Sequence, residues 1–224
     1  MIDACESSPS YIRSIAAYQP GKPTAELARE IGIEEARIVK LASNENPLGV
    51  SPMARAAIER ELAELARYPD GAGFELKRAL CAHYQVDASQ LVLGNGSNDV
   101  LELIARVFLA PGASAVFSQH AFAVYPLATQ GAGASAIQVP ARDHGHDLVA
   151  MAAAVRADTH VMWIANPNNP TGTFATPESV IALLERVPAR VVVVLDEAYN
   201  EYLPDAQRVD SLRWIERFPN LVVT

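Results

Sequence analysis

Val191-Val-Val-Val-Leu-Asp-Glu-Ala-Tyr-Asn-Glu-Tyr202 is the stretch of sequence that decides the fold. Its first five residues are all apolar, so neither face of a strand built from them would face water. Such a run is typical of an interior strand of a parallel sheet that helices cover on both faces. The run ends at Asp196, and open α/β sheets bind ligands at the carboxyl ends of their strands. Because an unpaired carboxylate there is costly to bury, we favour a functional role for Asp196.

Length and composition limit the class of protein. The 224 residues are enough for one large domain with a small extension. The net charge of −8 argues against nucleic acid or an anionic membrane as the main partner. The two cysteines are too few for a disulfide framework, and no secretory signal or membrane-spanning run is seen. We therefore expect a cytoplasmic protein.

The order of apolar runs predicts the architecture. Residues 1–50 contain many turn-forming residues and are expected to form an N-terminal arm and part of a small domain. Residues 51–224 are expected to form a large domain that begins with two helices and then alternates strands with helices. The expected strands are 91–93, 114–118, 135–139, 161–165, 191–195 and 221–224. This pattern predicts an α/β fold, with a mostly parallel sheet and helices on both faces. Because the last strand stops at Thr224, we expect the chain to be cut there.

Two loops that follow strands carry polar side chains. Gly94–Asp99 precedes a helix and is either a phosphate site at the helix N-terminus or a plain helix cap. A dinucleotide fingerprint would need a glycine at Asp99, so a nicotinamide cofactor is disfavoured. Asn166–Gly172 contains two prolines and a glycine, and is either a turn or a rigid support that directs the Asn168 and Asn169 amides at a ligand oxygen.

The Asp196-Glu197 pair has a competing interpretation as the magnesium ligands of a nucleotide hydrolase. That class requires an upstream phosphate loop of the form G-x-x-x-x-G-K-[ST]. The one Gly-Lys pair, Gly21-Lys22, is followed by Pro23 and lacks the first glycine. The hydrolase interpretation therefore fails, and no metal site is expected.

One ligand would satisfy these two loops and the segment that begins at Asp196. Its phosphate would bind at Ser97 and Asn98, its ring nitrogen at Asp196, and its phenolic oxygen at Asn169 and Tyr199. Phe122, which follows another strand, would cover the ring face. A ligand with these three groups is pyridoxal phosphate.

The motifs LASNENPLG, RYPDGAG, LGNGSND, ANPNNPTG and VVLDEAYNEY occur in this order from about Tyr18 to the end of the chain. In these motifs the chain resembles the fold-type I, pyridoxal-phosphate-dependent aminotransferases, and among them the histidinol-phosphate aminotransferases. The resemblance implies that Asp196 pairs with the pyridine nitrogen and that Asn169 and Tyr199 bond the ring hydroxyl. Ser97 and Asn98 would hold the phosphate, and Phe122 would stack on the ring.

The resemblance also implies an assembly and a reaction. Tyr68 would reach the phosphate of the cofactor in a neighbouring subunit of a homodimer, and Tyr18 and Asn44 would lie near the substrate. The reaction would be transamination of histidinol phosphate with 2-oxoglutarate in histidine biosynthesis. The family's Schiff-base lysine follows the strand that begins at Leu221, so we expect it beyond Thr224 and expect the 224 residues alone to be inactive.

The chain departs from the family pattern at two positions, and alternatives stay open. Phe122 stands where the family often has tyrosine, and Asn98-Asp99 stands where Asp-Glu is common. A related enzyme acting on aromatic amino acids, or a threonine-phosphate decarboxylase, is one alternative. A non-catalytic fragment is the other.

Overall fold

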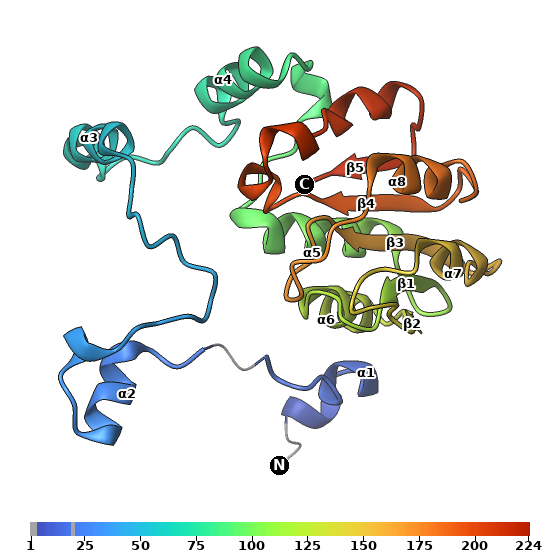
Figure 1. Ribbon diagram of the computed structural model, residues 1–224, viewed down its shortest axis with the longest axis horizontal. Helices are drawn as coiled ribbons and strands as arrows, with labels where there is room; N and C mark the ends of the chain where they lie inside the picture. Colours follow the sequence, from blue (N-terminus) through green and yellow to red (C-terminus); the bar gives the residue numbers. More distant parts are fainter. Residues whose placement is uncertain (1–3, 19–20) are drawn as a thin grey trace. The chain divides into compact units, whose positions relative to one another are not determined.

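The computed structural model describes residues 4–18 and 21–224, which form two compact units (Figure 1). The first unit contains the described residues up to Ala16 together with Leu80–Thr224. The second contains the described residues from Ala17 to Ala79. The domain boundary expected at residue 50 stays a prediction.

The first unit is built on a five-stranded sheet in the order β2-β1-β3-β4-β5. All four strand pairs are parallel. The strands are β1 (Ser114–Ser118), β2 (Ser135–Val139), β3 (Thr159–Ala165), β4 (Val192–Asp196) and β5 (Leu221–Val223). The expected α/β fold with a parallel sheet is therefore confirmed, and β4 is an interior strand, as its apolar run predicted.

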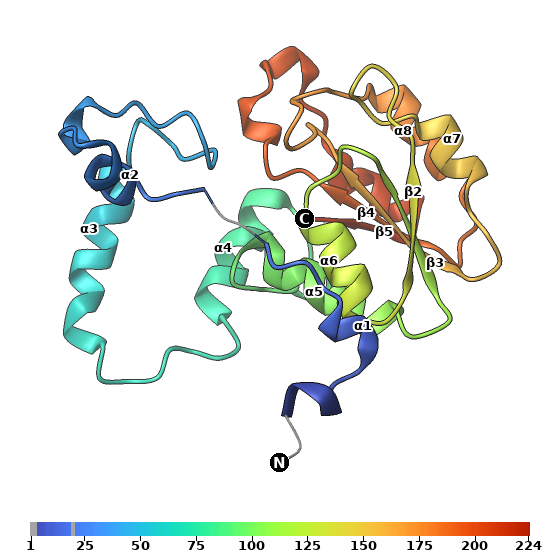
Figure 2. The same ribbon diagram turned by 90° about the horizontal axis from the view of Figure 1, so that it is seen from below.

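Helices cover both faces of this sheet (Figure 2). One face packs on α5 (Gly96–Phe108) and α6 (Val124–Gly131) through a core that includes Leu101, Phe117 and Trp163. The other face packs on α7 (Leu148–Ala153), α8 (Pro177–Leu184) and the 3-10 helix η7 (Ser211–Glu216). Because both faces are covered, β3 and β4 are almost completely buried.

Local sequence signals account for where two of these helices begin. The Thr176 side chain accepts from the Ser179 N–H, and Pro177 occupies the first turn of α8. The Asp147 carboxylate accepts from the Ala150 N–H at the start of α7. Each side chain satisfies a backbone donor that has no partner inside its helix.

The strand expected at 91–93 is not formed. The 3-10 helix η4 (Ala88–Gln90) precedes an irregular stretch, and β5 pairs only with β4 among the described strands. A pocket is lined both by Leu91 and by Val222 and Val223 of β5. A strand exists only where a neighbour completes its backbone hydrogen bonds, and no such neighbour reaches residues 91–93.

The remaining helices of the first unit lie at its N-terminal end and along the loop after β4. They are η1 (Ala4–Ser7), α1 (Ser10–Arg13), η5 (Asn200–Tyr202) and η6 (Asp205–Gln207). The Gln130 side chain of α6 donates to the Tyr11 carbonyl at 3.1 Å, which ties α1 to the first unit.

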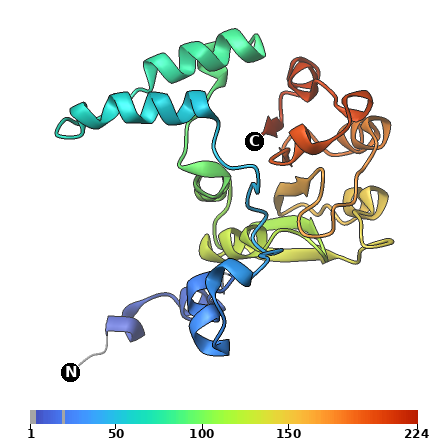
Figure 3. The same cartoon turned by 60° about the vertical axis from the view of Figure 1, so that its left-hand side comes forward.

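The second unit has little core of its own. Its elements are α2 (Thr24–Ile31), η2 (Glu35–Arg37), α3 (Pro52–Glu61) and η3 (Leu62–Glu64), and α4 (Phe74–Tyr84) begins in it (Figure 3). Ala28 is the one buried apolar residue that the structure describes in this unit, and Leu41 and Leu48 are each 92% exposed. Within the described residues, no helix is long and apolar enough to cross a membrane.

Candidate cofactor site

The strand order places a switch point between β1 and β3. From β1 the chain continues to β2 on one side of the sheet, whereas β3, β4 and β5 follow one another on the other side. In open parallel sheets, ligands bind at such a point, beyond the carboxyl ends of the strands. The loops that begin after Ser118, Ala165 and Asp196 all start at this edge.

Asp196 ends β4 and is only 5% exposed. Its Oδ2 accepts a hydrogen bond of 2.8 Å from the Tyr125 hydroxyl, and its Oδ1 accepts one of 3.2 Å from the Ala198 N–H. Burial raises the pKa of the Asp196 carboxyl, and these two hydrogen bonds oppose that shift. The nearby Thr224 hydroxyl opposes the shift as well. Both carboxylate oxygens are therefore held, and each keeps a lone pair that a ligand could use.

Tyr125 is a residue of this site that sequence reasoning missed. It lies in the first turn of α6, is completely buried, and stacks on Trp163 with ring centroids 5.5 Å apart. Burial, followed by the charge of Asp196, raises the pKa of the Tyr125 hydroxyl, so the hydroxyl keeps its proton. The available signal was its position three residues after Phe122, which would place both residues on one side of a helical turn.

The loop after β3 is held by its own asparagines. The Asn166 amide donates to the Ala175 carbonyl at 3.0 Å and accepts from the Ala175 N–H at 2.8 Å. The Asn168 amide donates to the His120 carbonyl at 2.8 Å, which joins this loop to the loop after β1. These hydrogen bonds tie the loop to its own backbone and to the loop after β1.

Asn169 and Tyr199, expected to share one ligand oxygen, lie side by side. The Asn169 Nδ2 donates to the Tyr199 hydroxyl at 3.3 Å. Both side chains are half-buried, and both can donate to a third oxygen placed between them. Two buried oxygens, Ser118 Oγ at the end of β1 and Asn168 Oδ1 in the loop after β3, have no hydrogen-bond partner among the described residues.

Ser97 and Asn98 lie in the first turn of α5, a helix of 13 residues. The Asp99 carboxylate accepts from the Asn95 N–H at 3.0 Å and so fixes the loop before them. Gly96 has φ +78°, with no atom within 4 Å of the position a Cβ would take. The Gly96 N–H donates to the Gly94 carbonyl at 3.0 Å, so an anion at this turn would be bound by the N–H groups that follow it in the helix.

Phe122 stands just before α6 and is half-buried. Its ring meets the edge of Tyr125, with centroids 5.8 Å apart and planes at 88°. Phe122 therefore packs on the same tyrosine that contacts Asp196.

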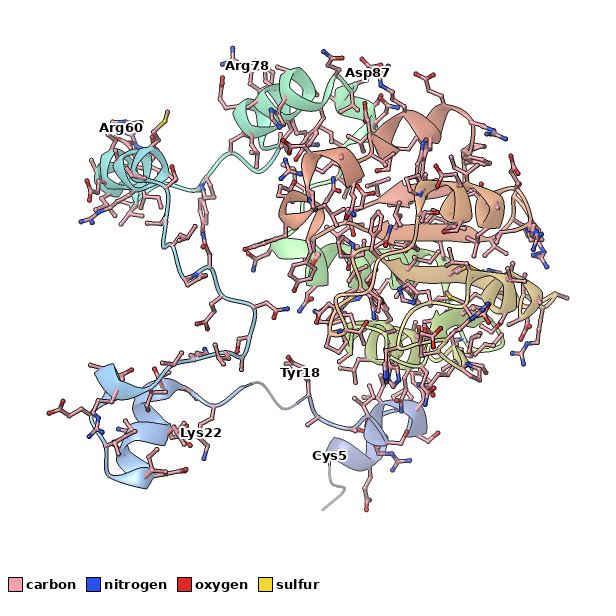
Figure 4. The ribbon with its side chains drawn as sticks, in the orientation of Figure 1. Cys5, Tyr18, Lys22, Arg60, Arg78 and Asp87 are labelled. Atoms are coloured by element: carbon pink, nitrogen blue, oxygen red, sulfur yellow. The ribbon has the colours of Figure 1, made fainter. Side chains whose placement is uncertain are left out.

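The three other predicted residues belong to the second unit. Tyr18, labelled in Figure 4, is 60% exposed, and Tyr68 is fully exposed. Asn44 has φ +49° and lies in the irregular stretch between η2 and α3. The roles expected for Tyr18, Asn44 and Tyr68 stay predictions.

Glu197 does not share the surroundings of Asp196. Its carboxylate accepts from the Ser211 hydroxyl at 2.8 Å and lines the pocket that Leu91 and Val222 also line. Burial raises the pKa of Glu197 to about 7, the Ser211 hydrogen bond opposes this, and the neighbouring carboxylate of Glu201 adds to it. The two adjacent acids of the motif therefore have separate environments.

The fold and these loops define a class of protein. The chain belongs to the aminotransferase class I and II family, whose model matches residues 36–224. The expected resemblance to this class of enzyme is confirmed.

Individual relatives have more specific names. The chain is 61% identical over 223 residues to "Histidinol-phosphate aminotransferase 2" of Nitrosospira multiformis, covering 100% of this chain and 57% of that protein. It is 64% identical over 214 residues to "Histidinol-phosphate aminotransferase 1" of Dechloromonas aromatica, covering 96% of this chain and 59% of that protein. The chain thus spans less than three fifths of the length of these relatives.

A solved structure shares the fold. The histidinol-phosphate aminotransferase from Sinorhizobium meliloti, crystallised in complex with pyridoxal-5'-phosphate, superposes with a TM-score of 0.82 at 27% identity. The superposition covers 97% of this chain and 59% of that chain.

Proposed function

We propose that this chain forms the cofactor-binding part of a pyridoxal-phosphate-dependent aminotransferase. The observation that carries the proposal is the buried Asp196 carboxylate at the end of β4, anchored on one side by Tyr125. The pair formed by Asn169 and Tyr199 on the adjoining loops supports it. When bound, pyridoxal phosphate supplies an aromatic ring that withdraws electrons from the substrate carbon.

The residues present fit this cofactor group by group. Asp196 is a carboxyl group kept from water, and its ionised form pairs well with a protonated ring nitrogen. The Asn169 amide and the Tyr199 hydroxyl together suit a negatively charged phenolic oxygen, because each has a proton to donate. The first turn of α5, with Ser97 and Asn98, suits a phosphate dianion.

Each residue has a defined task in this proposal. Asp196 holds a proton on the ring nitrogen, which makes the ring a better acceptor of electrons. Tyr199 and Asn169 stabilise the negative charge of the phenolic oxygen, and Phe122 restricts the tilt of the ring. These interactions orient the group and favour the charge distribution that the reaction needs.

For the substrate, we propose histidinol phosphate with 2-oxoglutarate as the amino acceptor, a reaction of histidine biosynthesis. The support is that relatives at 56–64% identity are named for this substrate. A structure named for L-threonine-O-3-phosphate decarboxylase matches at 22% identity with a TM-score of 0.61, and at that identity the likeness concerns the fold alone. The histidinol-phosphate proposal is therefore the better supported of the two.

We propose a homodimer and a cytoplasmic location for the whole protein. The second unit leaves Leu41, Leu48, Met53 and Tyr68 at least 84% exposed, and side chains of this kind are commonly covered by a partner. Cys5 and Cys81 form no disulfide, which suits a reducing compartment.

The first experiment is a titration of the 224-residue chain with pyridoxal phosphate, followed by the change in absorbance of the ligand. The native chain is expected to bind, and Asp196→Asn is expected to bind roughly 10- to 100-fold more weakly, because a hydrogen bond to a charged group is lost. The matched control is Asp205→Asn, since Asp205 is exposed and forms a surface ion pair with Arg208. Equal affinity of the native chain and Asp196→Asn would contradict the assigned role.

The substrate is tested separately in a strain that lacks histidinol-phosphate aminotransferase. The gene that encodes this chain, expressed with its natural downstream sequence, is expected to restore growth without histidine. Restoration of growth only in a strain that requires phenylalanine and tyrosine would favour the aromatic alternative instead. The same gene carrying Asp196→Asn serves as the negative control.

A further inference from the structure

Tyr125 is held in place by the sheet rather than by its own helix alone. Its ring lies almost parallel to that of Trp163 in β3, with an angle of 5° between the planes. Trp163 is itself oriented, because its Nε1 donates to the Thr129 hydroxyl at 3.2 Å. Thr129 lies one helical turn after Tyr125 in α6. All three side chains are completely buried, so the Tyr125 hydroxyl has one fixed position.

The Tyr125 hydroxyl has a single proton, and it donates that proton in a hydrogen bond to the Asp196 carboxylate. The donor-acceptor distance of 2.8 Å is that of a good hydrogen bond. A donor aimed at a carboxylate favours its charged form, whereas burial favours the neutral form. The bond also fixes the plane of the carboxylate, because the other oxygen is held by the Ala198 N–H.

We propose that Tyr125 is a positioning residue that keeps Asp196 ionised and oriented toward the ring nitrogen of the cofactor. This inference rests on the proposed function, since it assigns a task to Tyr125 only if Asp196 pairs with that nitrogen. Trp163 and Thr129 serve the same end by fixing the tyrosine ring. The link from Thr129 through Trp163 and Tyr125 to Asp196 joins α6, β3 and β4.

The titration of other ionisable groups near Asp196 has to be distinguished from the titration of Asp196 itself. Those that interact with Asp196 or with Tyr125 are Tyr199 and Glu197, both on the segment that follows β4. Because the pKa of Glu197 lies at about 7, its titration falls within the pH range of the test. The measurement is therefore made in a Glu197→Gln background as well as in the native chain.

The test is the affinity for pyridoxal phosphate as a function of pH, measured for the native chain and for Tyr125→Phe. The variant keeps the ring that stacks on Trp163 and removes only the hydroxyl. Affinity is expected to fall on the acidic side as Asp196 becomes protonated. In Tyr125→Phe the midpoint of this fall is expected to lie about one pH unit higher, a tenfold change in proton affinity. Above both midpoints the two proteins are expected to bind equally well.

A second variant makes the test independent of whether Tyr125→Phe folds. Site-specific 3-fluorotyrosine at position 125 keeps the ring and the hydroxyl but makes the hydroxyl a stronger donor, so the midpoint is expected to move to lower pH. Superimposable pH profiles for all three proteins would overturn the inference, and so would an equal loss of affinity at every pH. Failure of the native chain to bind, or equal binding by Asp196→Asn, would instead overturn the proposed function and this inference with it.

Discussion

Replacing Glu197 with glutamine is expected to stabilise the protein at neutral and higher pH. Glu197 is half-buried, and it accepts a hydrogen bond from Ser211 that the glutamine carbonyl can also accept. Its pKa of about 7 in the folded protein lies above its ordinary value of 4.5. The folded state therefore binds this proton more tightly than the unfolded chain, and ionisation of Glu197 opposes folding.

The magnitude follows from the two pKa values. Their difference, 7 − 4.5, is 2.5 pH units, which corresponds to about 3 kcal/mol of stability lost between pH 4.5 and 7. Solvent around the half-buried side chain reduces this to about 2 kcal/mol. For a chain of this length, about 2 kcal/mol corresponds to a rise of roughly 4–8 °C in Tm.

The assay is thermal unfolding of the native chain and of Glu197→Gln at pH 5 and at pH 8. The difference in Tm between the two proteins is expected to be small at pH 5 and to reach the full value at pH 8. Glu216→Gln, which changes an exposed carboxylate of η7, is the matched control and is expected to show no such trend. A Tm difference that is the same at both pH values would refute the reasoning.

Substitutions at three further positions test the supports of the fold and of the site by urea unfolding. Asn166→Ala removes both partners of the Ala175 backbone and is expected to cost about 2–4 kcal/mol; a cost below about 1 kcal/mol would mean that water replaces the amide. Met151→Ala removes a completely buried side chain of α7 and is expected to cost about 2–5 kcal/mol, with no change in the slope of the unfolding transition. Asp147→Ala removes the cap of α7 and is expected to cost about 0.5–2 kcal/mol, whereas Asp147→Asn should retain most of the stability.

Much of the architecture was predictable because its signals are local. The valine run of β4, the cap and proline of α8 and the alternation of strands with helices each depend on neighbours within about ten residues of sequence. The strand at 91–93 was predicted wrongly for the opposite reason. Three apolar residues indicate a strand only if another strand lies beside them, and that neighbour is not visible in the local pattern.

The sequence by itself determined that a carboxylate would end a buried strand and that Ser97, Asn169 and Tyr199 would follow strands or begin helices. Only the tertiary structure decided which side chains meet. Tyr125 and Asp196 are 71 residues apart in sequence, and Asn169 and Tyr199 are 30 apart, yet each pair forms a hydrogen bond. The periodicity of apolar residues indicates which face of a helix or strand a residue occupies. The pairing of the Tyr125 hydroxyl with the Asp196 carboxylate depends instead on the order of strands in the sheet, because that order brings distant loops to one edge.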